Sequence, residues 1–259
     1  MRQWLRPARR DTGYLPGRVI DVMIYGGSRP DLLRLCLRTL AEHLIFPSGR
    51  LRLLFQDCDF MPSLAVECIE IVREHGGFEA ARVHHPTGQP GVFSYGWSIT
   101  AALDDLIRAP LVFHLEEDHE FIRPVDLDLV WDLFESNPRL NQLRLNRRKN
   151  PSEENDGAVK VVERTLHAGL RDAVCSSSKN WYFQPSIWRV GYVRQRWLGH
   201  RDNVHHAAQH DLGLPDVRLP AEHYIDVLGL ATLGGIGAPA YLRHTGGPER
   251  SLHTVLGRV

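Results

Sequence analysis

Apolar runs and amphipathic segments alternate along the first half of the chain. Runs rich in Val, Ile, Leu and Phe at Val19–Tyr25, Leu51–Gln56 and Leu111–Leu115 predict strands that are buried on both faces. A shorter strand is expected at Ala81–His85, and the segments with helical spacing are Ser28–Leu40, Leu64–His75 and Phe93–Ile107. This alternation of strands and helices predicts right-handed βαβ units and a largely parallel sheet.

The pattern becomes weaker after residue 121. Helices are expected at Val125–Glu135, Ser186–Trp197 and Pro220–Leu230, and strands at Leu140–Leu145 and Asn180–Phe183. The polar segment Lys149–Val159 is typical of a surface loop. We therefore expect a single domain with an irregular arm at 1–17, a regular half at 18–121 and a less regular half at 122–259.

The fourth predicted strand ends in three consecutive acids, Glu116, Glu117 and Asp118. Carboxylates this close repel one another, and without a counter-charge one of them is driven toward its neutral form. A divalent cation removes that conflict, and Mg2+ and Mn2+ prefer carboxylate oxygens. Because open α/β sheets bind ligands at the carboxyl ends of their strands, the cluster predicts a metal site for a phosphate-bearing ligand. The alternative is a helix amino terminus whose acids complement the helix dipole.

The composition of the 259-residue chain narrows the choice of function. Apolar content of 43% and charged content of 24% are ordinary for a globular protein, and a formal net charge of zero argues against a nucleic-acid-binding protein. The four cysteines form no CxxC pair, which favours free thiols in a reducing compartment. No apolar stretch is long enough for an integral membrane segment, so we expect a cytoplasmic protein. G-x-G-x-x-G and Walker A motifs are absent, which disfavours dinucleotide-binding and P-loop chemistry.

The order of these features resembles the GT-A glycosyltransferases, in particular the family-2-like enzymes. A Gly-Gly-Ser-Arg-Pro turn leads from the first strand into a Leu-rich helix, Asp57 follows the second strand, and "HLEEDHEF" closes the fourth. In this chain Gly27-Ser28 stands where the family more often has Tyr-Asn, and His119 stands where an aromatic residue or a further acid is common. The resemblance implies an α/β fold of the GT-A, Rossmann-like type, with a mostly parallel central sheet flanked by helices.

The resemblance also implies that the two halves of the chain bind different substrates. Residues 18–121 would bind a nucleotide-sugar donor, most simply a UDP- or GDP-sugar, and residues 122–259 would bind an acceptor. The residues that it assigns to the nucleotide are Tyr25, Gly26, Gly27, Arg29, Asp57, Gln89, Glu116 and Glu117.

The same resemblance implies a Mn2+ or Mg2+ ion bridging the two phosphates, which stabilises charge on the leaving diphosphate. Asp118 is the expected ligand of that ion. Glu116 would face the ribose or reach the metal through water, and His244 would complete the metal shell or contact the diphosphate.

Transfer with inversion needs a carboxylate base that deprotonates the acceptor hydroxyl. Glu222, at the expected start of a late helix, is the candidate for this role, and Asp211 is the reserve. The sequence leaves open the donor base and sugar, the stereochemical outcome, the oligomeric state and the acceptor, which could be a glycan, a lipid, a small molecule or a protein.

Each of these residues also has a purely structural interpretation. Asp57 could be an ordinary turn residue, His244 a structural histidine, and Arg29 the partner of a surface acid. The basic stretch Arg139–Lys149 could bind an acidic acceptor, although a solvated strand end and loop is favoured. Trp188 could face an acceptor, although aromatic residues at this spacing more often belong to a core.

Two other functions remain open from the sequence. One is a sugar-phosphate nucleotidyltransferase, because Gly26-Gly27-Ser28-Arg29 weakly echoes the Gly-rich loop of those enzymes. The other is a non-catalytic GT-A-like domain that binds a glycan or a protein.

Overall fold

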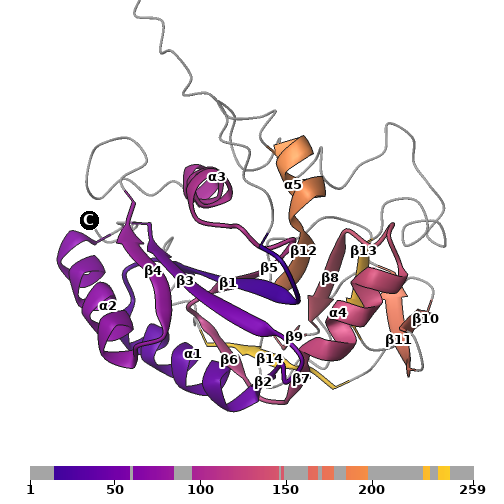
Figure 1. Cartoon of the computed structure of the whole chain (residues 1–259). Helices are drawn as coiled ribbons and strands as arrows, with labels where there is room; N and C mark the ends of the chain where they lie inside the picture. The colour runs from indigo at the N-terminus through magenta and orange to yellow at the C-terminus, as the bar shows by residue number, and fades with distance from the viewer. Residues whose placement is uncertain are drawn as a thin grey trace, which may run out of the picture.

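The fold is built on one large central sheet (Figure 1). The computed structural model describes residues 15–58, 61–84, 95–145, 147–148, 163–168, 171–177, 185–197, 230–233 and 239–245. The described part of the sheet has nine strands in the order β10-β11-β13-β8-β12-β5-β1-β3-β4. Seven of these nine strands run in one direction, and only β11 and β12 are reversed. The sheet is therefore mostly parallel, as the alternating pattern predicts.

The strands of the central sheet come from both halves of the chain. The first half provides β1 (Val19–Gly26), β3 (Arg50–Asp57), β4 (Phe78–Val83) and β5 (Leu111–Glu116). The second half provides β8 (Gln142–Leu145), β10 (Glu163–Ala168), β11 (Arg171–Ser177), β12 (Ser186–Arg189) and β13 (Leu230–Leu233). Because β12 pairs antiparallel with both β5 and β8, it joins the two halves into one sheet.

Helices cover both faces of this sheet (Figure 1). The described helices are α1 (Pro30–His43), α2 (Pro62–His75), α3 (Tyr95–Asp105), α4 (Leu127–Ser136) and α5 (Val190–Trp197). Pro30 and Pro62 occupy the first helical turns of α1 and α2, where a missing N–H costs nothing, and Asp126 caps α4 by accepting from Leu129 N. None of the described helices is long and apolar enough to cross a membrane.

Alternate residues along the central strands pack into two separate hydrophobic cores. Ile20, Val22 and Ile24 of β1 pack with α1, α2 and α4, whereas Met23 and Tyr25 pack with α3 and α5. All eight residues of β1 are buried, as expected for a central strand with helices on both sides.

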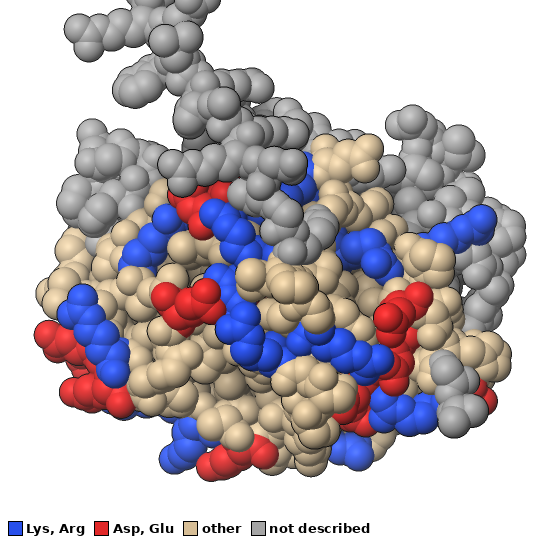
Figure 2. Space-filling model, viewed as in Figure 1, with Lys and Arg blue, Asp and Glu red and all other residues tan. Residues whose placement is uncertain are grey.

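Two small sheets accompany the central sheet in the described residues. One contains β6 (His119–Phe121), β14 (Leu242–His244) and β9 (Arg147–Arg148), and the other contains β2 (Leu44–Ile45) and β7 (Val125–Asp126). In the first of these, β14 lies between β6 and β9 and brings residues near the carboxyl end of the chain against the segment that follows β5. Acidic and basic side chains are both present on the face shown in Figure 2, so neither sign of charge covers it alone.

Several predicted elements differ from the structure. Ser186–Arg189 is a strand, not the start of a helix, because Ile187 packs into one core and Trp188 into the other, which is the period of a strand. Val125 and Asp126 precede α4 instead of belonging to it, and Leu230 begins β13 instead of ending a helix. The predicted strand at Asn180–Phe183, the loop at 149–159 and most of the helix at 220–230 lie outside the described residues.

Candidate functional site

The carboxyl ends of β1, β3 and β5 meet at one edge of the sheet. In the register of these strands, Gly26 lies opposite Asp57, and Tyr25 lies opposite Glu116. The three segments that the sequence assigned to a nucleotide site are therefore adjacent in space. This is the edge at which open α/β sheets bind their ligands.

Asp57 holds the turn that follows β1. Its two carboxylate oxygens accept hydrogen bonds from Ser28 N (2.9 Å) and Ser28 Oγ (2.7 Å), and Ser28 adopts a left-handed backbone with φ of 58°. Gly26 has no room for a side chain, because a Cβ atom would lie 2.7 Å from Asp57 Oδ2. Asp57 thus shapes the turn directly, which is the structural role that the sequence left open for it.

Glu117 is almost fully buried behind the same turn. Its Oε1 atom accepts from Gly27 N at 2.6 Å and from Arg29 Nε at 2.7 Å. Burial raises the pKa of Glu117, while the charge and hydrogen bond of Arg29 oppose that rise. Arg29 therefore connects the first turn to the acidic cluster and does not pair with Asp31 or a surface acid in the described contacts.

Asp118 lies among three basic groups. Its Oδ2 atom is 3.1 Å from Arg29 Nη1 and 3.2 Å from His244 Nε2, and its Oδ1 atom is 3.0 Å from His119 Nδ1. Burial disfavours the charge, but the two imidazoles and the guanidinium outweigh it and hold the pKa of Asp118 well below its ordinary value. Asp118 is therefore an ionised carboxylate.

His244 reaches this site from the far end of the chain. In the small sheet it lies directly opposite His119, and the two rings are 5.3 Å apart between centroids. Thr245 fixes the approach, because its N and Oγ1 atoms donate to Asp118 O at 2.8 and 2.9 Å. The structure thus brings together Asp118 and His244, which are separated by more than a hundred positions in the sequence.

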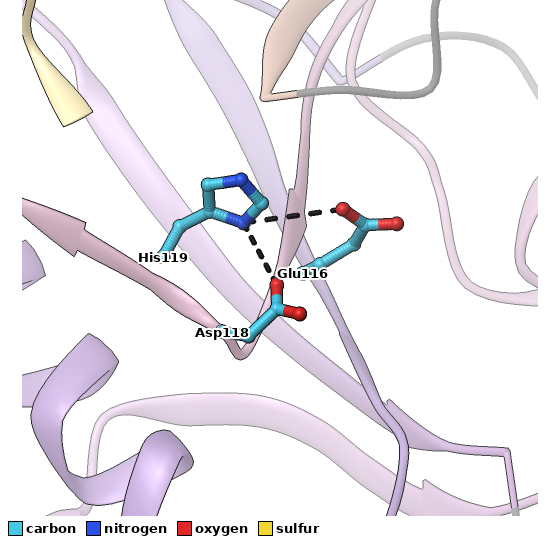
Figure 3. Close-up of side chains that lie close together, drawn as sticks. All are labelled: Glu116, Asp118 and His119. Atoms are coloured by element: carbon cyan, nitrogen blue, oxygen red, sulfur yellow. Dashed lines mark ion pairs between the residues drawn. The ribbon is translucent and has the colours of Figure 1, made fainter. Parts of the chain in front are cut away.

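The acids are followed by the strand β6, so the alternative of an acidic helix amino terminus is wrong. The group that could hold a cation consists of Glu116, Asp118 and His119, whose ligand atoms lie within 4.8 Å of one another (Figure 3). Oδ1 of Asp118 is buried, and among the described residues no hydrogen bond to it meets the usual geometry, although His119 Nδ1 lies 3.0 Å away. A buried carboxylate oxygen in this setting fits a divalent cation.

The remaining predictions concern Arg144, Trp188 and three residues outside the described part of the chain. Arg144 is buried at 4% exposure, so the favoured interpretation of its segment as a solvated strand end is wrong for this residue. Trp188 is 1% exposed and stacks on His114 with ring centroids 4.2 Å apart, which makes it a core residue. Gln89, Asp211 and Glu222 lie outside the described residues, and their roles stay predictions.

The sequence did not indicate two members of the cluster. His119 was noted only as a departure from the family pattern, although its position directly after Asp118 could have singled it out. Thr245 carries no signal of its own, because its contact depends on the pairing of β14 with β6.

Comparison with solved structures shows what this architecture is similar to. Residues 1–349 of S. aureus TarS in complex with UDP match with a TM-score of 0.55 and 13% identity, over 90% of this chain and 62% of that one. The chain has a GT-A fold. A second structure of TarS 1–349 gives a TM-score of 0.51 and 14% identity, over 90% of this chain and 61% of that one.

The mannosyltransferase PcManGT from Pyrobaculum calidifontis, in complex with GDP-Man and Mn2+, is less similar, with a TM-score of 0.47. Its identity is 14%, over 93% of this chain and 60% of that chain. The GT-A chain thus spans about three fifths of each of these longer proteins. No protein-family model matches its sequence, and no curated protein matches it closely enough to count as a relative. These likenesses concern the fold.

Proposed function

We propose that this chain is a metal-dependent glycosyltransferase that moves a sugar from a nucleoside-diphosphate sugar to an acceptor hydroxyl. The observation that carries the proposal is the convergence of Glu116, Asp118, His119 and His244 at the carboxyl edge of a GT-A sheet. The UDP complex of the TarS fragment, which shares the fold, makes UDP the first donor nucleotide to try.

The proposed ion, Mn2+ or Mg2+, would be held by Asp118 and Glu116 with the two histidines, and when bound it would stabilise the negative charge of the departing diphosphate. Arg29 is already at this edge and offers a second positive charge to the phosphates. Tyr25, Gly26 and Gly27 would line the nucleotide pocket, since Gly26 has no side chain and lies beside Asp57.

The base and the acceptor site belong to the second half of the chain in this proposal. Glu222, or Asp211 in reserve, would take the proton from the acceptor hydroxyl if transfer inverts the anomeric centre. Gln89 would lie near the ribose and diphosphate. The donor site is therefore the part of the proposal for which the described residues provide support.

Thermal-shift measurements with UDP, GDP, ADP, dTDP and CMP, each with Mn2+, Mg2+ or EDTA, test the donor site. A ligand that binds only the folded state stabilises it by about 2.7 kcal/mol at a hundredfold excess over its dissociation constant. We expect one nucleoside diphosphate to raise the melting temperature only when metal is present. If no nucleotide does so in folded protein, the chain is a non-catalytic binding domain.

Asp118→Asn is the variant that addresses catalysis. We expect it to remain folded, to lose the metal-dependent thermal shift, and to lower release of nucleoside diphosphate by about 10²- to 10³-fold, because charge stabilisation of the leaving group is lost. Asp172→Asn, at an exposed pair on β11, is the matched control and should behave like the parent protein. Full activity of Asp118→Asn would refute the proposal, and release of pyrophosphate by the parent protein would point to a nucleotidyltransferase.

A further inference from the structure

The guanidinium of Arg29 is held by two different carboxylates. Its Nε atom donates to Glu117 Oε1 at 2.7 Å, and its Nη1 atom lies 3.1 Å from Asp118 Oδ2. A guanidinium is planar and carries its N–H groups in a fixed fork, so contacts at two of its nitrogen atoms fix both the position and the rotation of the plane. The Arg29 side chain is 19% exposed, which places this held group at the boundary between the protein interior and solvent.

Glu117 is the deeper of the two carboxylates. Its side chain is 2% exposed, compared with 10% for Asp118. Its Oε1 atom also accepts from Gly27 N at 2.6 Å, and its own N–H donates to Tyr25 O at 3.1 Å. Glu117 is therefore tied to the turn after β1 through both its backbone and its side chain.

Gly27 leaves the space that this arrangement needs. A Cβ atom at Gly27 would lie 3.2 Å from Glu117 Oε1 and 3.5 Å from Arg29 Nε. Because Gly27 has no side chain, a single carboxylate oxygen can accept from the backbone of the turn and from the guanidinium at the same time.

Glu117 does not belong to the group that could hold a cation. Among the described residues, the ligand atoms that lie within 4.8 Å of one another come from Glu116, Asp118 and His119. Oε1 of Glu117 already has two donors, and the residue is only 1% exposed, so a ligand has almost no surface on which to contact it. Its carboxylate is therefore placed to act on a ligand through Arg29.

The Nη2 atom of Arg29 has a different setting. Within the described residues, no hydrogen bond or ion pair joins it to another side chain. A guanidinium anchored through Nε and Nη1 can offer its remaining N–H groups to an anion without the loss of rotamer freedom that a loose arginine undergoes on binding. Phosphate oxygens are among the strongest acceptors for such a group.

We infer that Glu117 is a positioning residue, which holds the guanidinium of Arg29 for the donor diphosphate and contacts neither the nucleotide nor the ion itself. The inference rests on the proposed function for the identity of the ligand, but not for the contact between Glu117 and Arg29.

A double-mutant cycle on UDP affinity, measured by titration calorimetry at saturating Mn2+, tests this role. Loss of one charge-assisted hydrogen bond to the diphosphate should weaken UDP binding about 10- to 100-fold in Arg29→Gln. Glu117→Gln should lose a similar factor, and the double variant no more than Arg29→Gln alone, because both changes remove the same contact. Losses that multiply in the double variant, or an unchanged affinity in Glu117→Gln, would overturn the inference.

Glu67→Gln is the matched control for the loss of a glutamate charge. Glu67 of α2 pairs with Arg34 of α1 at 3.1 Å, and the two side chains are 42% and 56% exposed. An exposed pair of this kind contributes little, so the UDP affinity of Glu67→Gln should equal that of the parent protein.

Hydrogen exchange of the Arg29 Nε–H group, followed by NMR in protein with 15N-labelled arginine, tests the contact without any nucleotide. In the parent protein we expect this proton to exchange at least about 10-fold more slowly than that of the exposed Arg34, because it is buried and hydrogen-bonded. Glu117→Gln should lose this protection and Glu67→Gln should keep it. Equally fast exchange of the two arginines in the parent protein would overturn the inference even if Glu117→Gln does not fold.

The two proposals fail in different ways. Metal-dependent UDP binding that is unchanged in Glu117→Gln would overturn the positioning role and leave the glycosyltransferase in place. UDP binding that depends on Glu117 only through Arg29, in a protein that releases pyrophosphate instead of nucleoside diphosphate, would refute the glycosyltransferase and support the positioning role.

Discussion

At the scale of single residues, the main feature of the site is the balance between acidic and basic side chains around Asp118. Glu117 and Asp118 are both buried, and the Arg29 side chain, only 19% exposed, contacts both of them. Arg29 therefore already supplies part of the counter-charge that the acidic cluster requires, and the proposed metal ion would share Asp118 with it. Metal binding would then be coupled to the position of one arginine.

Arg29→Gln tests that coupling. Removing one partner of a buried pair leaves an uncompensated charge, and we expect a loss of about 3 kcal/mol in the free energy of unfolding. Mn2+ can then replace the missing cation, so the rise in melting temperature on adding Mn2+ should be larger than in the parent protein. Urea and thermal unfolding with and without Mn2+ measure both effects.

Arg34→Gln is the matched control for that experiment. Arg34 pairs with Glu67 at 3.1 Å, but both side chains are largely exposed, so the pair contributes little. We expect this variant to lose at most about 1 kcal/mol and to respond to Mn2+ like the parent protein. A smaller Mn2+ response in Arg29→Gln than in Arg34→Gln would contradict competition between Arg29 and the metal.

At the scale of elements, β1 is fixed at its amino end by a buried carboxylate. Asp21 Oδ2 accepts from Arg108 N at 2.5 Å and Ala109 N at 2.8 Å, and Oδ1 accepts from Arg52 Nη1 at 2.7 Å. These contacts join the loop before β5 and the first part of β3 to β1. One side chain therefore ties the three strands together at the end of the sheet opposite the candidate site.

Asp21→Asn should cost about 3 kcal/mol of stability, because Arg52 loses a buried partner. Burial is the largest influence on Asp21 and raises its pKa, although its donors oppose the rise. At pH values above about 3.9, the pKa of an Asp side chain in the unfolded chain, the native state therefore binds more protons than the unfolded state. The advantage of the parent protein over Asp21→Asn should therefore shrink as the pH rises through the folded pKa of Asp21.

Urea unfolding of both proteins between about pH 4 and 7 measures this difference across the relevant window. Asp172→Asn, which alters an exposed carboxylate, should show no such trend. An advantage that grows with pH would mean that the hydrogen bonds outweigh burial and lower the pKa of Asp21.

At the scale of the whole molecule, the candidate site depends on the late strand β14. β14 lies between β6 and β9, with Leu242 opposite Phe121 and His244 opposite His119. The contact of His244 with Asp118 in the candidate metal group thus depends on the pairing of β14 with β6.

Leu242→Ala tests this dependence. Leu242 is fully buried, and truncating a buried leucine typically costs about 2 to 5 kcal/mol. We expect Mn2+ affinity to fall about 10-fold as well, because His244 and Thr245 lose their support, whereas Leu133→Ala on α4 should lose comparable stability and retain its Mn2+ affinity. Isothermal titration calorimetry with Mn2+ measures the affinity of both variants. Equal affinities would contradict the role given to β14.

The sequence by itself determined the framework of strands in the first half of the chain. Val19–Tyr25 and Leu111–Leu115 are predicted to be strands because short apolar runs rich in Val, Ile, Leu and Phe fit a strand buried between two helical layers, and the structure confirms both. The placement of Asp57 and Glu116 at one edge also followed, since parallel strands joined by helices end on the same side. In both cases the local apolar pattern and the right-handedness of βαβ units are enough for the prediction.

Only the tertiary structure decided how the cluster is completed. The contact of Arg29 with Glu117 spans 88 positions, and that of Asp118 with His244 depends on β14 adding to β6. Ser186–Arg189 is a strand because it fills a place between β5 and β8, which no local pattern indicates. These outcomes arise from long-range pairing, whereas a sequence pattern reports only on the burial and period of its own segment.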